Sequence, residues 1–193
     1  MHPDDDHDHN THSDPVQHFV FYAVLVALKT LARPELKKTV IDSPDVVAVL
    51  AGDGVAGADL SELLSSFYEG RYAAFLGALA RVYPRLTADR WFAPHAAWFL
   101  REMRVAAYAQ FLESYKSVKL SGMAAIFGVT PAFLDAELAK LIAAGRVNAK
   151  IDAVAGIIEA SRSDTKNAQY TAVLKKGDAL LTAVQKLSRV IAL

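Results

Sequence analysis

The sequence contains no cysteine. This absence excludes disulfide bridges, thiolate metal sites and a cysteine nucleophile, and it fits a reducing compartment. No apolar run reaches the roughly 18–20 residues that a membrane-spanning helix requires. The longest run, at 19–28, ends before Lys29 and is predicted to be a buried helix. Only acidic charges precede it, which is the opposite of a signal peptide, so no membrane segment is expected.

Net charge is also absent, because 21 Lys and Arg balance 21 Asp and Glu. A neutral chain has no overall field that would attract nucleic acid or an anionic membrane. Residues 1–18 nevertheless hold five Asp, five of the six His and no basic residue. They show no apolar period, so we expect a disordered acidic tail. Its His and Asp side chains are potential Zn or Ni ligands, but a disordered tail fixes no geometry, and no metal site is expected.

Catalytic groups are scarce beyond residue 18. His95 is the only histidine there, and it lies at the expected start of a helix, where a surface or capping role is the simpler interpretation. The GDGVAG stretch at 52–57 follows no predicted strand, so it does not match a nucleotide-binding loop. We therefore expect no enzyme activity, no cofactor and no small-molecule substrate.

Hydrophobic residues make up 53% of the chain, which is enough for a core. Residues 19–116 show helical periodicity and are predicted to form a helical-repeat part. The AGDGVAGA stretch holds three glycines and is predicted to be a loop. We expect the next helix to begin at Asp59, with a capping box, and to end at Gly70. The helix after it should close at Pro84 and pack against the first as an antiparallel hairpin, as in helical-repeat solenoids.

Residues 117–160 follow the order of a winged helix: strand, helix, turn, helix, and then two strands joined by a turn. In the second helix, Thr130 is the expected N-cap and Gly145 the expected end. A winged helix that reads DNA needs cations on this helix. Residues 131–144 carry one Lys against one Asp and one Glu, so nucleic-acid binding is a poor match. We expect the edges of the short sheet to pair with neighbouring chains instead.

The last segment, 161–193, is predicted to be one long helix with a heptad stripe. The stripe recurs at spacings of three and four and consists of Tyr170, Val173, Gly177, Leu180, Val184, Leu187 and Ile191. Such a stripe has to be buried, either by folding back on its own domain or by joining a bundle with other chains, which we favour. The basic face of this helix is expected to pair with acidic neighbours rather than with RNA; it holds Lys175, Lys176, Lys186 and Arg189.

Several motifs occur in a fixed order along the chain: LESYKSV, FGV with FLDAEL, IAAGRV followed by KID, KNAQY and QKLSRVI. With them, the chain from about Phe19 to Leu193 resembles the PCI-domain family, a module shared by the proteasome lid, the signalosome and initiation factor 3. The KNAQY and QKLSRVI motifs are most similar to the branch in the lid of the 26S proteasome, and a signalosome subunit is the alternative. Members of the lid branch are about twice as long, so the resemblance covers only their C-terminal half.

The resemblance implies a mainly α fold, in which helical-repeat helices precede a winged-helix subdomain with a small β-sheet and a long C-terminal helix. It implies a non-catalytic scaffold that supports ubiquitin-dependent protein degradation in the cytoplasm and nucleus. The implied partners are other proteasome lid PCI subunits and the lid deubiquitinase module, held through sheet edges and a helical bundle. The implied interface residues are Arg146, Val147, Asn148, Ala149, Lys150, Ile151, Ile157, Ile158 and Glu159 in the sheet, and Tyr170, Val173, Leu174, Gly177, Leu180, Leu181, Val184, Leu187 and Ile191 in the last helix.

Overall fold

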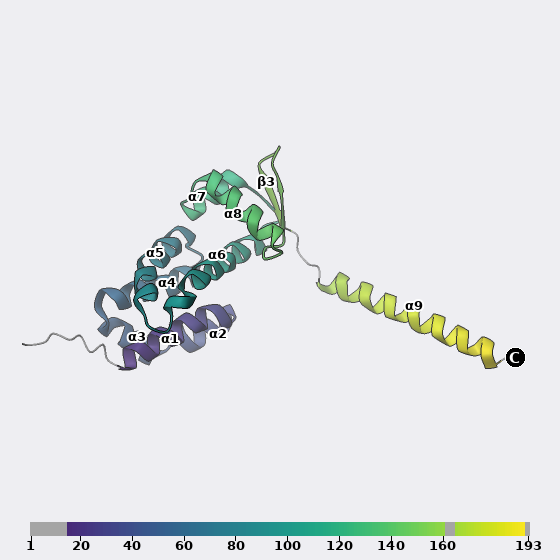
Figure 1. Cartoon of the computed structure of the whole chain (residues 1–193), viewed down its shortest axis with the longest axis horizontal. Coiled ribbons are helices and arrows are strands. Elements are labelled where there is room, and N and C mark those ends of the chain that lie inside the picture. Colours follow the sequence, from purple (N-terminus) through teal and green to yellow (C-terminus); the bar gives the residue numbers. More distant parts are fainter. Residues whose placement is uncertain (1–14, 161–164, 192–193) are drawn as a thin grey trace, which may run out of the picture.

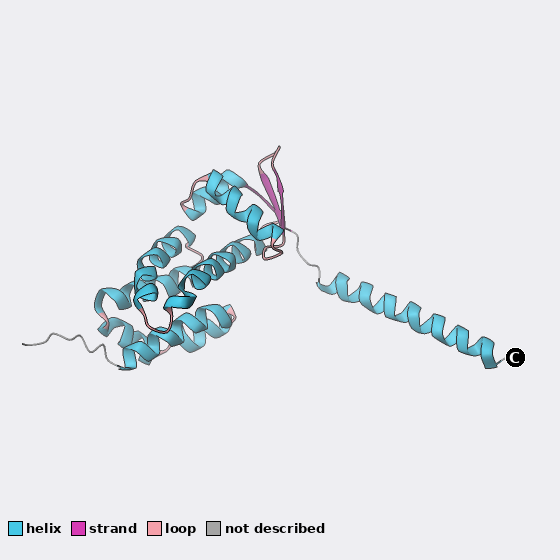
Figure 2. Cartoon of the chain, in the orientation of Figure 1, coloured by secondary structure: helices cyan, strands magenta, loops and turns pink. Residues whose placement is uncertain are grey.

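The computed structural model describes residues 15–160 and 165–191, with side chains described for 15–160 and 169–189. Its mainly helical architecture, with one small sheet and a separate terminal helix, confirms the fold class (Figures 1 and 2). In chain order the elements are α1 (Pro15–Thr30), α2 (Arg33–Leu36), a π-helical turn η1 (Lys37–Ile41), α3 (Pro44–Gly52), α4 (Gly54–Glu69), α5 (Tyr72–Ala88), a 3-10 turn η2 (Ala93–His95), α6 (Ala96–Glu113), β1 (Ser117–Lys119), α7 (Leu120–Phe127), α8 (Pro131–Ala143), β2 (Ala149–Asp152), β3 (Ile157–Ala160) and α9 (Thr165–Ile191).

Helix α1 begins earlier than the sequence pattern predicts. It starts at Pro15, so residues 15–18 are helical and the expectation of a disordered tail over all of 1–18 is wrong there. Proline suits the first turn of a helix, because the N–H that it lacks would have no partner inside the helix. Residues 1–14, which hold the rest of the expected tail, lie outside the described residues.

The AGDGVAGA stretch is helical, so the predicted loop is wrong. Helices α3 and α4 are separated by Asp53 alone, and Gly54 provides the turn with a φ of 58°. Gly57 then lies so close to α3 that a Cβ built on it would be 2.0 Å from the carbonyl oxygen of Leu50. The missing side chain at Gly57 therefore permits a close helix crossing.

Helix α4 ends at Gly70, which adopts a left-handed conformation, and α5 begins at Tyr72, so the predicted hairpin forms. Asp59 does not begin α4 but lies inside it, where its carboxylate pairs with Arg81 of α5 at 2.6 Å. Helix α5 also continues past Pro84 to Ala88. A proline costs an interior helical hydrogen bond, but the burial of Val82 and Leu86 on either side of it stabilises the continued helix.

The winged helix forms where the sequence predicts it, and its three predicted strands join in one sheet. Strand β3 pairs antiparallel with both β1 and β2, so it is the central strand. The Thr130 hydroxyl accepts a hydrogen bond from the Phe133 N–H, as expected for the N-cap of α8. Leu134, Leu138 and Leu141 then face the core, where all three are buried.

An aromatic cluster joins the helical part to the winged helix. The Phe127 ring, at the end of α7, lies 4.6 Å from that of Tyr72, 5.0 Å from that of Tyr108 and 5.6 Å from that of Phe111. Each aromatic pair contributes about 0.5–1.5 kcal/mol beyond the burial of its surface. The two parts therefore share one packed core.

Candidate protein-interaction site

Helix α9 carries seven of the eighteen exposed large apolar side chains among the described residues. Every side chain described on it is exposed, from Tyr170 at 73% to Leu174 and Leu181 at 60%. In Figure 1 the helix lies apart from the helical part and the winged helix. The stripe does not fold back on its own domain in this structure. The main chain of Ile191 belongs to α9, but its side chain lies outside the described side chains.

The stripe is wider than the seven predicted heptad positions, because Leu174 and Leu181 lie beside them. Burial of one leucine or valine side chain is worth about 1.5–3 kcal/mol. A helix that leaves so many apolar side chains in water gains this energy when it packs against other helices. The large apolar side chains that are exposed on α9 are those of Tyr170, Val173, Leu174, Leu180, Leu181, Val184 and Leu187.

The sheet supplies a second candidate surface, but only some of the residues predicted to form it are exposed. Because β3 is central, it presents no open edge, and the edges belong to β1 and β2. Three predicted interface side chains, those of Val147, Ala149 and Ile158, are buried in the protein's own core, so they are unavailable for contacts. Ile151 and Ile157 are half-buried, whereas Arg146, Asn148, Lys150 and Glu159 are exposed.

Two partly buried polar clusters, which sequence reasoning missed, tie the winged helix to the helical part. In the first, the Glu102 carboxylate of α6 is 3% exposed and accepts hydrogen bonds from Lys29 Nζ at 2.6 Å and from Arg146 at 2.7 Å. The hydrogen bond from Lys29, with that from Arg146, holds the pKa of Glu102 below its ordinary value although burial opposes the shift. We call these three residues the Glu102 cluster.

In the second, the Glu137 carboxylate of α8 accepts a hydrogen bond from the Tyr108 hydroxyl at 2.6 Å and lies 2.8 Å from Arg104 Nε. Burial, followed by the bond to Glu137, raises the pKa of Tyr108 far above its ordinary value. This Glu137 cluster ties α8 to α6. The sequence offered one signal for both clusters: a charged residue, Glu102 or Glu137, at a core-facing position of a helix. Helical periodicity shows such a position but does not show which distant residues bind the charge.

The winged helix is poorly arranged for reading DNA. The outer face of α8 borders a groove shared with α6, in which Glu137 is already paired with Arg104. Lys140 is the only cation within α8, and the exposed negative charge of Asp135 on the same helix offsets it. Phosphate contacts need several cations on the surface that meets the nucleic acid, so α8 does not provide them.

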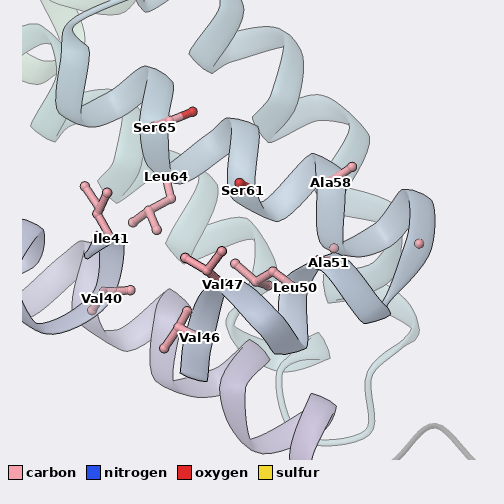
Figure 3. A pocket seen from close by; sticks show the side chains of 12 residues that line it. Val40, Ile41, Val46, Val47, Leu50, Ala51, Ala58, Ser61, Leu64 and Ser65 are labelled. Atoms are coloured by element: carbon pink, nitrogen blue, oxygen red, sulfur yellow. The ribbon is translucent and has the colours of Figure 1, made fainter. Parts of the chain in front are cut away.

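Small-molecule chemistry finds little support among the described residues. A hollow of about 280 Å³ lies between η1, α3 and α4, and its only polar lining side chains are Ser61 and Ser65. Figure 3 shows the side chains that line it. Within 15–160 and 165–191 no three His, Asp or Glu side chains gather as metal ligands. No helix of the same ranges is both long and apolar enough to cross a bilayer. The hollow is lined by Val40, Ile41, Val46, Val47, Leu50, Ala51, Gly54, Gly57, Ala58, Ser61, Leu64 and Ser65.

Two family models match this chain. One, described as a PCI domain, matches residues 80–162, which include the second half of α5, all of α6 and the winged helix. The other, described as the C-terminal helix of 26S proteasome regulatory subunit RPN7/PSMD6, matches residues 169–191. The second match coincides with the exposed part of α9, so the stripe belongs to a segment that has its own family model.

Relatives carry the same names. The chain is 51% identical over 173 residues to the 26S proteasome non-ATPase regulatory subunit 6 of Dictyostelium discoideum, covering 90% of this chain and 44% of that protein. It is 48% identical over 177 residues to the Arabidopsis thaliana homologue, covering 92% and 45%. It is 44% identical over 166 residues to the 26S proteasome regulatory subunit RPN7 of Saccharomyces cerevisiae, covering 86% and 38%. The chain thus spans less than half the length of these relatives.

Proposed function

Since this chain belongs to the PCI-domain family and also matches the RPN7/PSMD6 C-terminal helix, we propose that it is a non-catalytic scaffold subunit of the 26S proteasome regulatory-particle lid. Its role is to support ubiquitin-dependent protein degradation by holding other subunits in position. Its partners are other PCI subunits of the lid and the lid deubiquitinase module, and its place is in the cytoplasm and nucleus.

The observation that carries the proposal is the exposed apolar stripe of α9. A helix whose leucines lie at about 60% exposure, such as Leu174 and Leu181, has a strong tendency to enter a helical bundle. The open edges of β1 and β2 add a second contact of a different kind, through main-chain hydrogen bonds. A scaffold needs such surfaces and needs no catalytic group.

The signalosome alternative predicts the same fold and the same kinds of contact, so only the captured partners separate the two. We expect the tagged full chain, expressed in eukaryotic cells, to capture proteasome lid subunits that mass spectrometry identifies. Capture of signalosome subunits would assign the chain to that complex. Capture of neither would contradict the scaffold role for this chain. Microscopy of the same tagged chain tests the proposed location.

A substitution in the stripe tests whether α9 is the assembly contact. Leu180→Asp with Leu187→Asp places two charges on the stripe, and we expect at least a tenfold loss of captured lid subunits. Both leucines are exposed in the free chain, so its thermal midpoint should not fall. The matched control is Leu138→Asp, since Leu138 is fully buried and its loss should unfold the winged helix. Undiminished capture by the double variant would show that α9 is not the contact.

A further inference from the structure

Glu102 places a charge at a buried position of α6, where an apolar side chain would pack equally well. Glu102 lies among buried residues of α6 such as Phe99 and Met103. An ion pair at such a position is a weak source of stability compared with well-packed apolar residues, because the Glu102 carboxylate loses its hydration whereas Lys29 and Arg146 stay partly in water. Its main effect is directional, since the carboxylate fixes the positions of the groups that bind it.

The two groups that Glu102 fixes come from distant parts of the chain. Lys29 is on the last turn of α1, 73 residues before Glu102, and Arg146 follows α8, 44 residues after it. The same Arg146 nitrogen lies 2.7 Å from both carboxylate oxygens. This charge-assisted contact restrains where that end of the Arg146 side chain lies.

Arg146 lies in the turn that leads directly into β2. That turn begins at Gly145, whose φ of 67° reverses the chain, and the Arg146 N–H donates to the Leu141 carbonyl at 2.8 Å. Strand β2 has only β3 as a partner among the described strands, and its other edge is open. Beyond that single ladder, β2 is held by the small buried side chain of Ala149, by Val147 just before it, by the half-buried Ile151, which packs against the core, and by the Arg146 contact.

We propose that Glu102 is the positioning residue of the β2 edge: it anchors Arg146 to α6 and α1 and so sets the angle at which β2 is offered to a neighbouring chain. The importance of this angle for assembly rests on the scaffold function proposed above. The anchoring itself does not, because it is a property of the isolated chain. The Glu137 cluster has no such role, since it ties α8, and not β2, to α6.

Hydrogen exchange on the full chain tests the anchoring. Glu102→Gln keeps the shape of the side chain but removes the charge that holds Arg146. We expect the protected amides of Ala149–Asp152, and their partners on β3, to exchange at least tenfold faster relative to the amides of α7. The matched control is Glu137→Gln, which removes another partly buried carboxylate between α6 and the winged helix and should change the β2 amides by less than twofold.

Arg146→Met is the second variant, because Arg146 is half-exposed and its removal leaves Glu102 paired with Lys29, so the fold is retained. It should reproduce the tenfold effect at β2, and it decides the question if Glu102→Gln does not fold. A smaller effect, or an equal rise in exchange across the whole chain, would overturn the proposal. Lid capture is then measured with the same variants: failure of capture by the unmodified chain refutes the scaffold function, whereas equal capture by all variants refutes only the importance of the β2 angle.

Discussion

Alanine at Gly57 tests the close crossing of α3 and α4. In an ordinary helix this substitution stabilises by about 1 kcal/mol, because alanine has the better helix propensity. Here the new Cβ would lie 2.0 Å from the Leu50 carbonyl oxygen and 2.9 Å from Asp53 Cβ. The first atom belongs to the main chain of α3 and the second is fixed to the residue that joins the two helices, so the helices have to move apart. Such overpacking costs about 1–3 kcal/mol or more. We expect a net destabilisation on the order of 1–2 kcal/mol once the gain in propensity is subtracted.

Gly77→Ala is the matched control for this prediction. Gly77 lies within α5, and its nearest contact would be the flexible end of Arg81 at 3.6 Å. This variant should therefore show the propensity gain of about 1 kcal/mol without the clash. Urea unfolding followed by circular dichroism measures both variants, and thermal midpoints should shift in opposite directions by about 2–4 °C per kcal/mol. If both glycines gave the same stabilisation, the close crossing at Gly57 would be refuted.

Three further predictions concern the polar clusters. Lys29→Met and Arg146→Met should each cost about 1 kcal/mol, but together roughly 3–5 kcal/mol, because Glu102 then stays buried without a cation; additive losses in urea unfolding would contradict this. Because the folded pKa of Glu102 is lowered, its contribution to stability should vanish as pH falls through that pKa, and Glu102→Gln should remove this pH dependence of the unfolding free energy. Tyr108→Phe should cost about 1–2 kcal/mol by thermal unfolding, because Glu137 loses a buried hydrogen bond; an unchanged midpoint would show the bond to be unimportant.

The sequence predicted the helices best where one face is apolar and a specific residue ends the element. Thr130 caps α8 and Gly70 ends α4 because each supplies what the helix terminus lacks: a hydrogen-bond acceptor in one case and a left-handed residue in the other. The heptad spacing of apolar residues likewise predicted the long helix α9. These signals are local, so they survive whatever the rest of the fold imposes.

Predictions failed where packing outweighed local preference. Three glycines in AGDGVAGA indicate a loop, yet Gly57 serves a close approach between helices, and only the neighbouring helix reveals that need. Pro84 indicates a helix end, yet the buried residues around it hold α5 together. The central position of β3 was also missed, because strand order depends on where β1 returns to the sheet, and the pairing of Val118 with Ile158 has no local signature.

The partners of Glu102 illustrate the remaining gap. Lys29, Glu102 and Arg146 are far apart in the sequence, and each alone reads as an ordinary surface charge. Their meeting depends on the crossing of α1 with α6 and on the turn after α8. The apolar stripe and the polar clusters also differ in when they contribute to stability. The large apolar side chains of the α9 stripe are 60–73% exposed and contribute only when another chain covers them, whereas the two polar clusters act in the isolated chain. We therefore expect substitutions in the α9 stripe to weaken assembly without lowering the stability of the folded part. Substitutions in the Glu102 cluster should change the folding stability and, through the position of β2, assembly as well.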